Sequence, residues 1–150
     1  EERKNYHSTV FVATDQGYKN MLKLQYLSNT KAGECEIDGF TGSYYFKPRI
    51  HEQMLFHYAK DSDLIVTSGC RLSIINQSFL EGNDMLALSL LEMFKNNIPL
   101  FMIELHIAHN EVEERLFWFL KKIAYEMNLE TVLFLFIVSC VVALAIARKR

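Results

Sequence analysis

The last twenty residues, TVLFLFIVSCVVALAIARKR (131–150), decide which fold the sequence predicts. Between positions 132 and 147 the only polar residue is Ser139, and the stretch then stops at a basic run, 148–150. A segment that is apolar on every side and ends in long basic side chains is typical of a membrane span, because those side chains can reach the headgroup layer. The sequence therefore predicts a transmembrane helix over 131–147, followed by a basic tail.

The preceding segment is expected to be part of the same helix. Residues 110–130 place apolar side chains at helical spacing, and neither Gly nor Pro interrupts the chain from Asn110 to Arg150. A helix of that length would extend about 60 Å, too long for the core of so small a domain. The apolar stretch is shorter than the roughly 17–25 residues of an ordinary span, so a C-terminal helix buried in an oligomer is the alternative.

The rest of the chain predicts a small α+β domain over residues 1–109. Alternating apolar and polar residues predict an N-terminal antiparallel β-sheet, and helices and strands alternate after it. The expected strands of the sheet are 8–14, 18–27, 34–40 and 42–46, and the elements that follow are a helix at 48–60, a strand at 63–69, a helix at 85–97 and a strand at 98–106. An amphipathic helix at 110–130 then leads to the membrane.

The charge distribution argues against nucleic acid as a partner. The formal net charge is −2, and the basic runs are Lys121-Lys122 and 148–150. Neither run has aromatic residues interleaved with the cations, as a base-stacking surface would. The sequence predicts membrane protein subunits and the lipid bilayer as partners, and no nucleic acid.

The densest group of ligand-type side chains lies at IELHIAHNEVEE (103–114). Its candidate metal ligands are Glu104, His106, His109 and Glu113, because imidazole and carboxylate three or four residues apart on a helix can hold zinc or iron. The apolar run before His106 indicates a strand, however, which breaks that helical register. The sequence therefore favours a solvated strand-to-helix corner, and it predicts no metal, no cofactor and no catalytic residue.

Three further residues distinguish the possible compartments. Cys35 and Cys70 could pair in an oxidising compartment, an alternative that the sequence leaves open. Asn76 begins an N-glycosylation acceptor, Asn-Gln-Ser. Cys70 follows a predicted strand and a glycine, but no nearby histidine in the sequence marks it as a nucleophile.

We expect, from these patterns, a non-catalytic accessory subunit of a larger membrane complex, in the mitochondrial inner membrane or else the ER membrane. The side chains expected to contact partners are Phe117, Trp118, Leu120 and Tyr125 above the membrane, and Ser139, Cys140 and Ala143 within it. Two alternatives are a membrane-anchored metal-dependent enzyme that uses His106 and His109, and a type I luminal or extracellular binding domain.

Overall fold

The computed structural model describes the backbone of residues 6–137 and 140–146, and the side chains as far as Leu133. It divides into two compact units. One unit consists of Phe11–Ile65 and Asn96–Leu100, and the other of Glu1–Val10, Val66–Lys95 and Phe101–Arg150.

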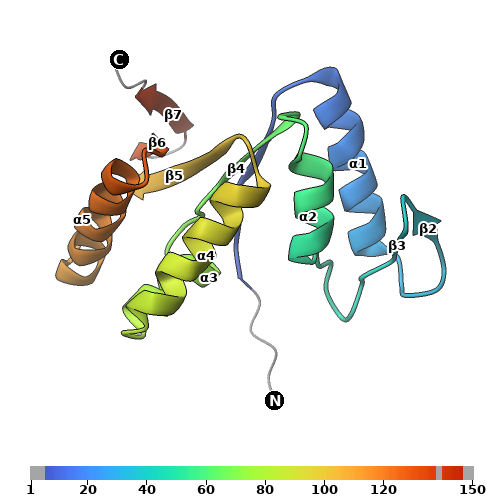
Figure 1. Cartoon of the computed structure of the whole chain (residues 1–150), viewed down its shortest axis with the longest axis horizontal. Coiled ribbons are helices and arrows are strands. Elements are labelled where there is room, and N and C mark those ends of the chain that lie inside the picture. Colours follow the sequence, from blue (N-terminus) through green and yellow to red (C-terminus); the bar gives the residue numbers. More distant parts are fainter. Residues whose placement is uncertain (1–5, 138–139, 147–150) are drawn as a thin grey trace. The chain divides into compact units, whose positions relative to one another are not determined.

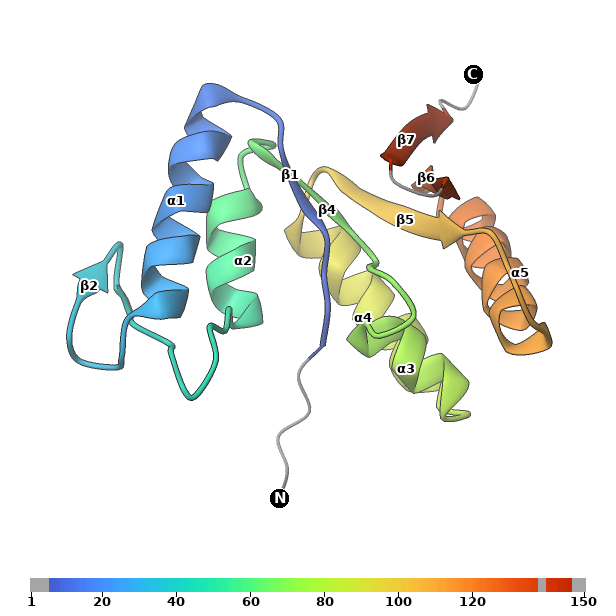
Figure 2. The ribbon, with the colours of Figure 1, turned by 180° about the vertical axis from the view of Figure 1, so that it is seen from behind.

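The described residues form an α+β fold with a mixed sheet (Figure 1). The helices are α1 (Asp15–Asn29), α2 (Glu52–Ala59), α3 (Ile74–Leu80), α4 (Asp84–Asn97) and α5 (Glu111–Glu126). The strands are β1 (Val10–Val12), β2 (Glu36–Ile37), β3 (Phe40–Thr41), β4 (Leu64–Thr67), β5 (Phe101–His106), β6 (Glu130–Ile137) and β7 (Cys140–Ile146). One sheet has the order β1-β4-β5-β6-β7, and β2 pairs with β3 in a separate antiparallel hairpin (Figure 2). Within the larger sheet β5 is parallel to both β4 and β6, and β7 is antiparallel to β6.

The predicted N-terminal antiparallel sheet is wrong, because residues 18–27 lie in helix α1. The hydroxyl of Thr14 accepts a hydrogen bond from the Gly17 N–H at 3.0 Å and caps the start of the helix. The buried side of α1 is set by residues three or four apart, namely Gly17, Asn20, Leu24, Leu27 and Ser28. Tyr18, Leu22 and Tyr26, which suggested a strand, are instead exposed.

The predicted continuous helix from Asn110 to the C-terminus is also wrong, because α5 ends at Glu126. Asn128 has φ 52°, a left-handed conformation that helices commonly use to terminate. The N–H of Asn128 donates to the Tyr125 carbonyl at 3.3 Å, and the N–H of Leu129 donates to the Ala124 carbonyl at 2.9 Å. This pair of hydrogen bonds is the Schellman arrangement, in which Asn128 takes the left-handed position that glycine usually occupies. A helix can therefore end here without glycine or proline.

The predicted transmembrane helix is contradicted by strands β6 and β7. The segment is rich in Val, Ile and Phe, residues that favour strands, and its backbone pairs with β5 on one side while β7 folds back along it. Among the described residues, no helix combines the length and the apolar character that crossing a bilayer requires. Ser139 and the predicted basic tail, 148–150, lie outside the described residues.

The unit that contains β5 is built around apolar contacts between that strand and α5. Ile103 and Leu105 of β5 are buried, and so are Leu116, Leu120 and Ile123 of α5. Removing such a side chain from water stabilises a fold by roughly 1.5–3 kcal/mol. Phe79 of α3 stacks on Phe119 of α5 with ring centroids 3.9 Å apart. This packing fixes α5 beside the end of β5.

Candidate functional site

A pocket lies beside the ends of strands β4 and β5. Because these strands are parallel, Thr67 and His106, their last residues, lie toward the same edge of the sheet, which is where α/β folds commonly bind ligands. The pocket has a volume of about 200 Å³ and is lined by Cys70, Arg71, Asn76, Glu104, His106, Ile107, His109, Glu113, Leu116, Phe117 and Leu120. All of these residues belong to one compact unit.

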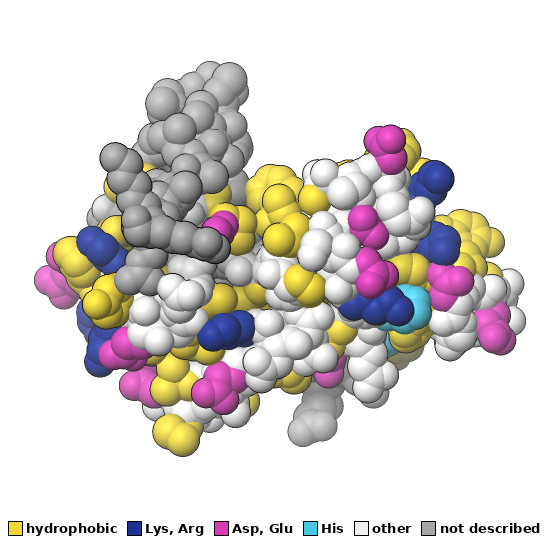
Figure 3. Space-filling view, turned by 45° about the horizontal axis from the view of Figure 1, so that its top comes forward, with side chains coloured by type: hydrophobic (Ala, Val, Ile, Leu, Met, Phe, Trp, Pro, Cys, Tyr) yellow, Lys and Arg dark blue, Asp and Glu magenta, His cyan; other side chains and the backbone are white. Residues whose placement is uncertain are grey.

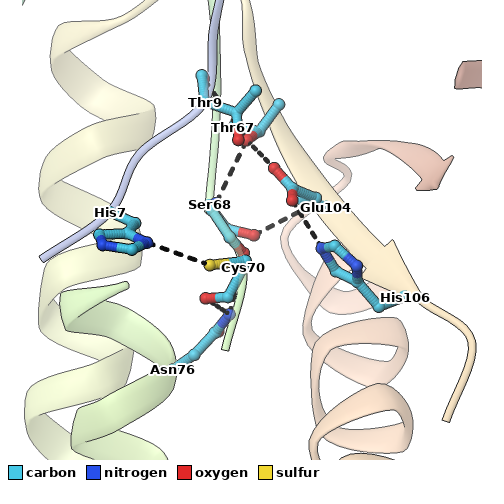
Figure 4. Close-up of polar contacts among 9 residues, drawn as sticks. His7, Thr9, Thr67, Ser68, Cys70, Asn76, Glu104 and His106 are labelled. Atoms are coloured by element: carbon cyan, nitrogen blue, oxygen red, sulfur yellow. Dashed lines mark hydrogen bonds and ion pairs between the residues drawn. The ribbon is translucent and has the colours of Figure 1, made fainter. Parts of the chain in front are cut away.

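Glu104 and His106 form the best-defined polar pair of the pocket (Figure 4). They are two residues apart on β5, so their side chains emerge on the same face of the strand. Nε2 of His106 lies 2.6 Å from Oε1 of Glu104, and the hydroxyl of Thr67 on β4 donates to the other carboxylate oxygen. The backbone N–H of Glu104 donates to the Ser68 hydroxyl at 3.0 Å.

These contacts keep the carboxyl group of Glu104 ionised. Glu104 is only 3% exposed, and burial by itself would raise its pKa. The hydrogen bonds from His106 and Thr67 act in the opposite direction, and the pKa of Glu104 is held below its ordinary value. An ionised carboxylate beside an imidazole fixes the ring orientation, as in many catalytic and binding sites.

The turn after β4 supplies a second wall of the pocket. Gly69 has φ +79°, and a Cβ atom there would lie 2.7 Å from the backbone oxygen of His7, so only glycine fits. Cys70 follows, with its Sγ atom 3.8 Å from Nδ1 of His7 (Figure 4).

Asn76 holds this turn in place. Its side-chain amide donates to the carbonyls of Gly69 and Cys70 at 3.0 and 2.9 Å. Asn76 is 1% exposed, and its Oδ1 atom is buried without a hydrogen-bond partner. A buried acceptor without a donor is costly, so a donor group on a ligand or a water molecule would stabilise this position.

The third wall is the start of α5. Asn110 caps the helix by accepting from the Glu113 N–H at 3.0 Å, and the Glu113 carboxylate accepts from the His109 N–H at 2.9 Å. This backbone hydrogen bond is the main reason that the pKa of Glu113 lies below its ordinary value. Nη1 of Arg71 lies 3.9 Å from the same carboxylate.

The four candidate metal ligands from the sequence all line this pocket, but they separate into two pairs. Glu104 contacts His106 through side chains, and Glu113 contacts the backbone of His109. In the part of the chain that the structure describes, no three His, Cys, Asp or Glu side chains gather as a metal site would require.

The predicted partner-contact residues occupy different environments. Trp118 and Tyr125 are 55% and 73% exposed, so protein contact through them stays a prediction. Phe117 and Leu120 line the pocket, and Leu120 is only 2% exposed. Cys140 and Ala143 lie in β7, beyond the described side chains.

The alternative of a glycosylated, disulfide-bonded ectodomain is not supported. Cys35 and Cys70 are free cysteines, and burial of Asn76 leaves its side chain inaccessible to a glycan.

Arg71, Asn76 and Thr67 were absent from the sequence-based candidates for this site. In the sequence, Thr67 and Arg71 lie two residues before and after Gly69, the glycine that ends the predicted strand 63–69, whereas no such signal marks Asn76.

Comparison with known proteins identifies the chain more closely than the site geometry does. The family described as PHP domain matches residues 1–126. DNA polymerase III subunit alpha of Deinococcus radiodurans is 29% identical over 83 residues, which make up 55% of this chain. The chain spans about 5% of the length of that polymerase subunit.

These matches correct the functional predictions made from the sequence. The membrane accessory subunit, the membrane-anchored enzyme and the type I ectodomain are contradicted, as are the mitochondrial inner membrane and ER assignments. The exclusion of nucleic acid is contradicted by the likeness to a DNA polymerase subunit. The net charge of the chain was a poor guide to nucleic-acid binding, because it does not show where cationic side chains gather. Figure 3 shows Lys, Arg, Asp and Glu side chains interspersed on one face.

Proposed function

The chain belongs to the PHP domain family, and from that premise we propose that it works as the PHP domain of a DNA polymerase III alpha-type protein, where its pocket binds the terminal phosphate and sugar of a nucleotide or DNA strand. The observation that carries the proposal is the composition of the pocket. One cation, Arg71, and two imidazoles line it together with the carboxylates of Glu104 and Glu113. A buried acceptor without a partner, Oδ1 of Asn76, belongs to the same lining.

Arg71 is the proposed phosphate ligand. Its side chain is 53% exposed, and its 3.9 Å separation from the Glu113 carboxylate exceeds the roughly 2.7–2.9 Å of a charge-assisted hydrogen bond. The guanidinium therefore retains donors for a phosphate group, whose oxygens it can bind in bidentate fashion. The imidazole of His109 supplies a further donor around the same volume.

Asn76 is the proposed sugar ligand. Its Oδ1 atom needs a donor, and a sugar hydroxyl is one, whereas a fully ionised phosphate offers acceptors only. A ligand that carries both groups would satisfy Arg71 and Asn76 together.

The size and the apolar wall of the pocket fit the same ligand. A volume of about 200 Å³ is below that of most drug-sized pockets, so the site suits the end of a nucleotide. Leu116 and Phe117 of α5 provide apolar surface for the carbon atoms of a sugar.

Isothermal titration calorimetry with thymidine 5′-monophosphate tests this proposal. Arg71→Gln should weaken binding at least about tenfold, because it removes a charged hydrogen-bond donor to phosphate. Arg115→Gln makes the same charge change at an exposed position of α5 outside the pocket, and should leave affinity unchanged. Unphosphorylated thymidine should bind more weakly and be insensitive to Arg71→Gln. Absence of nucleotide binding, or equal weakening by both substitutions, would overturn the proposal.

A further inference from the structure

The loop at residues 44–49, Tyr-Tyr-Phe-Lys-Pro-Arg, carries the most exposed aromatic groups outside the pocket unit. It joins β3 to α2 and lies within the unit that contains α1 and α2 (Figure 2). Phe46 is 79% exposed and Tyr45 is 59% exposed. Their ring centroids lie 4.6 Å apart in an edge-to-face arrangement, which leaves a large aromatic surface in contact with solvent.

The backbone of Phe46 is strained. Its φ is +57°, in the left-handed region that bulky side chains rarely adopt. Such strain persists where the surrounding structure or a function requires it. Phe46 gains little from burial, so packing within the chain does not account for an aromatic residue here.

Two cations flank the exposed rings. The guanidinium carbon of Arg49 lies 5.4 Å from the Tyr45 ring centroid, and Lys47 is exposed next to Phe46. Among the residues that the structure describes, no carboxylate lies within ion-pair distance of Lys47 or Arg49.

We propose that the loop at residues 44–49 binds single-stranded nucleic acid, with bases stacking on Phe46 and Tyr45 and phosphates contacting Lys47 and Arg49. The loop places aromatic side chains at 44–46 directly beside cations at 47 and 49. Stacking groups next to cationic groups suit the bases and phosphates of a single strand. Lysine is depleted at protein–protein interfaces, so the unpaired Lys47 beside the rings favours nucleic acid over a protein partner. The site lies on different residues from the nucleotide pocket and does not depend on it.

Fluorescence anisotropy with a labelled oligothymidine, using the full chain, tests this second site. Phe46→Gly should weaken binding at least about fivefold, the lower end of the effect of one base–aromatic stack. The same substitution relieves the positive φ, so the urea midpoint of unfolding should stay the same or rise. Phe46→Trp should keep the affinity, because the ring is retained. Lys47→Gln should make the slope of log affinity against log salt concentration less steep by roughly 0.7, because one contact to a phosphate is lost.

Matched controls come from the exposed surface of α1. Tyr18→Ala removes a ring that is 58% exposed, and Lys19→Gln removes a neighbouring exposed cation. Both variants should bind oligothymidine as the unsubstituted chain does. The proposal is overturned if the chain does not bind oligothymidine, if Phe46→Gly binds normally, or if Tyr18→Ala weakens binding equally. It is also overturned if Phe46→Gly abolishes capture of a purified polymerase subunit but not DNA binding, since the loop would then be a protein interface.

Discussion

The imidazole of His106 and the carboxylate of Glu104 lie 2.6 Å apart, Nε2 to Oε1, on one face of strand β5. Thr67 on the neighbouring strand contacts the other carboxylate oxygen. Contacts from two strands therefore fix the orientation of the Glu104 carboxylate. The carboxylate in turn orients the His106 imidazole, which lines the pocket.

Glu104→Gln should lower the free energy of unfolding by about 1–3 kcal/mol at neutral pH, since it removes a buried charged acceptor from two donors. The folded-state pKa of Glu104 lies below its usual value of 4.5. Its ionised form thus contributes stability above that pH, and the contribution disappears as the pH falls through the lower folded-state value. Urea unfolding of both proteins from neutral to acidic pH measures the difference.

The exposed residue Glu92 on α4 provides the control for that experiment. Glu92→Gln should change stability little at any pH. A stability difference for Glu104→Gln that stays constant down to the lowest pH would show that ionisation of Glu104 does not stabilise the fold.

Gly69→Ala should destabilise the chain more than Gly82→Ala does. Both glycines have positive φ, +79° and +81°, so each substitution should cost about 1–2 kcal/mol in backbone strain. At Gly69 a Cβ atom would also approach the His7 backbone oxygen to 2.7 Å, whereas Gly82 has open space around it. Equal losses in chemical denaturation would mean that the turn after β4 is not closely packed.

Asn128→Gly should keep or slightly increase stability, and Asn128→Ala should cost about 1 kcal/mol. Glycine adopts the left-handed conformation that ends α5 without penalty, whereas alanine does not. Thermal unfolding followed by circular dichroism gives the comparison. If alanine were the more stabilising substitution, α5 would not end at this residue, and the continuous helix predicted from the sequence would have to be reconsidered.

Several elements could be predicted because their patterns are local. The strand expected at 63–69 contains β4, and the helix expected at 85–97 nearly coincides with α4. Asn110, the expected first residue of the helix at 110–130, is the N-cap of α5. Residues 18–27 were predicted as a strand because Tyr18, Leu22 and Tyr26 fit an alternating pattern as well as a helical one. Only contacts made by Leu24 and Leu27 with the rest of the fold distinguish the two.

The predictions for the C-terminal segment and for the site were wrong or incomplete for different reasons. A run of apolar residues is compatible with a membrane helix and with buried strands, and length alone did not separate them. The His106 and His109 cluster was visible in the sequence, but Arg71 and Asn76 join it only because β4 and β5 are parallel neighbours. The aromatic residues and cations of the loop at residues 44–49 are visible in the sequence, but the prediction about nucleic acid rested on net charge and on consecutive basic residues alone.

Resolved NMR signals of the histidine side chains, recorded as thymidine 5′-monophosphate is added, test the central claim most directly. His106 and His109 line the proposed nucleotide pocket, whereas His51 and His57 belong to the other unit and serve as internal controls. The account predicts saturable shifts of the His106 and His109 ring signals, with His51 and His57 unchanged. Unchanged signals from His106 and His109, or shifts of equal size at all four residues, would contradict nucleotide binding in this pocket.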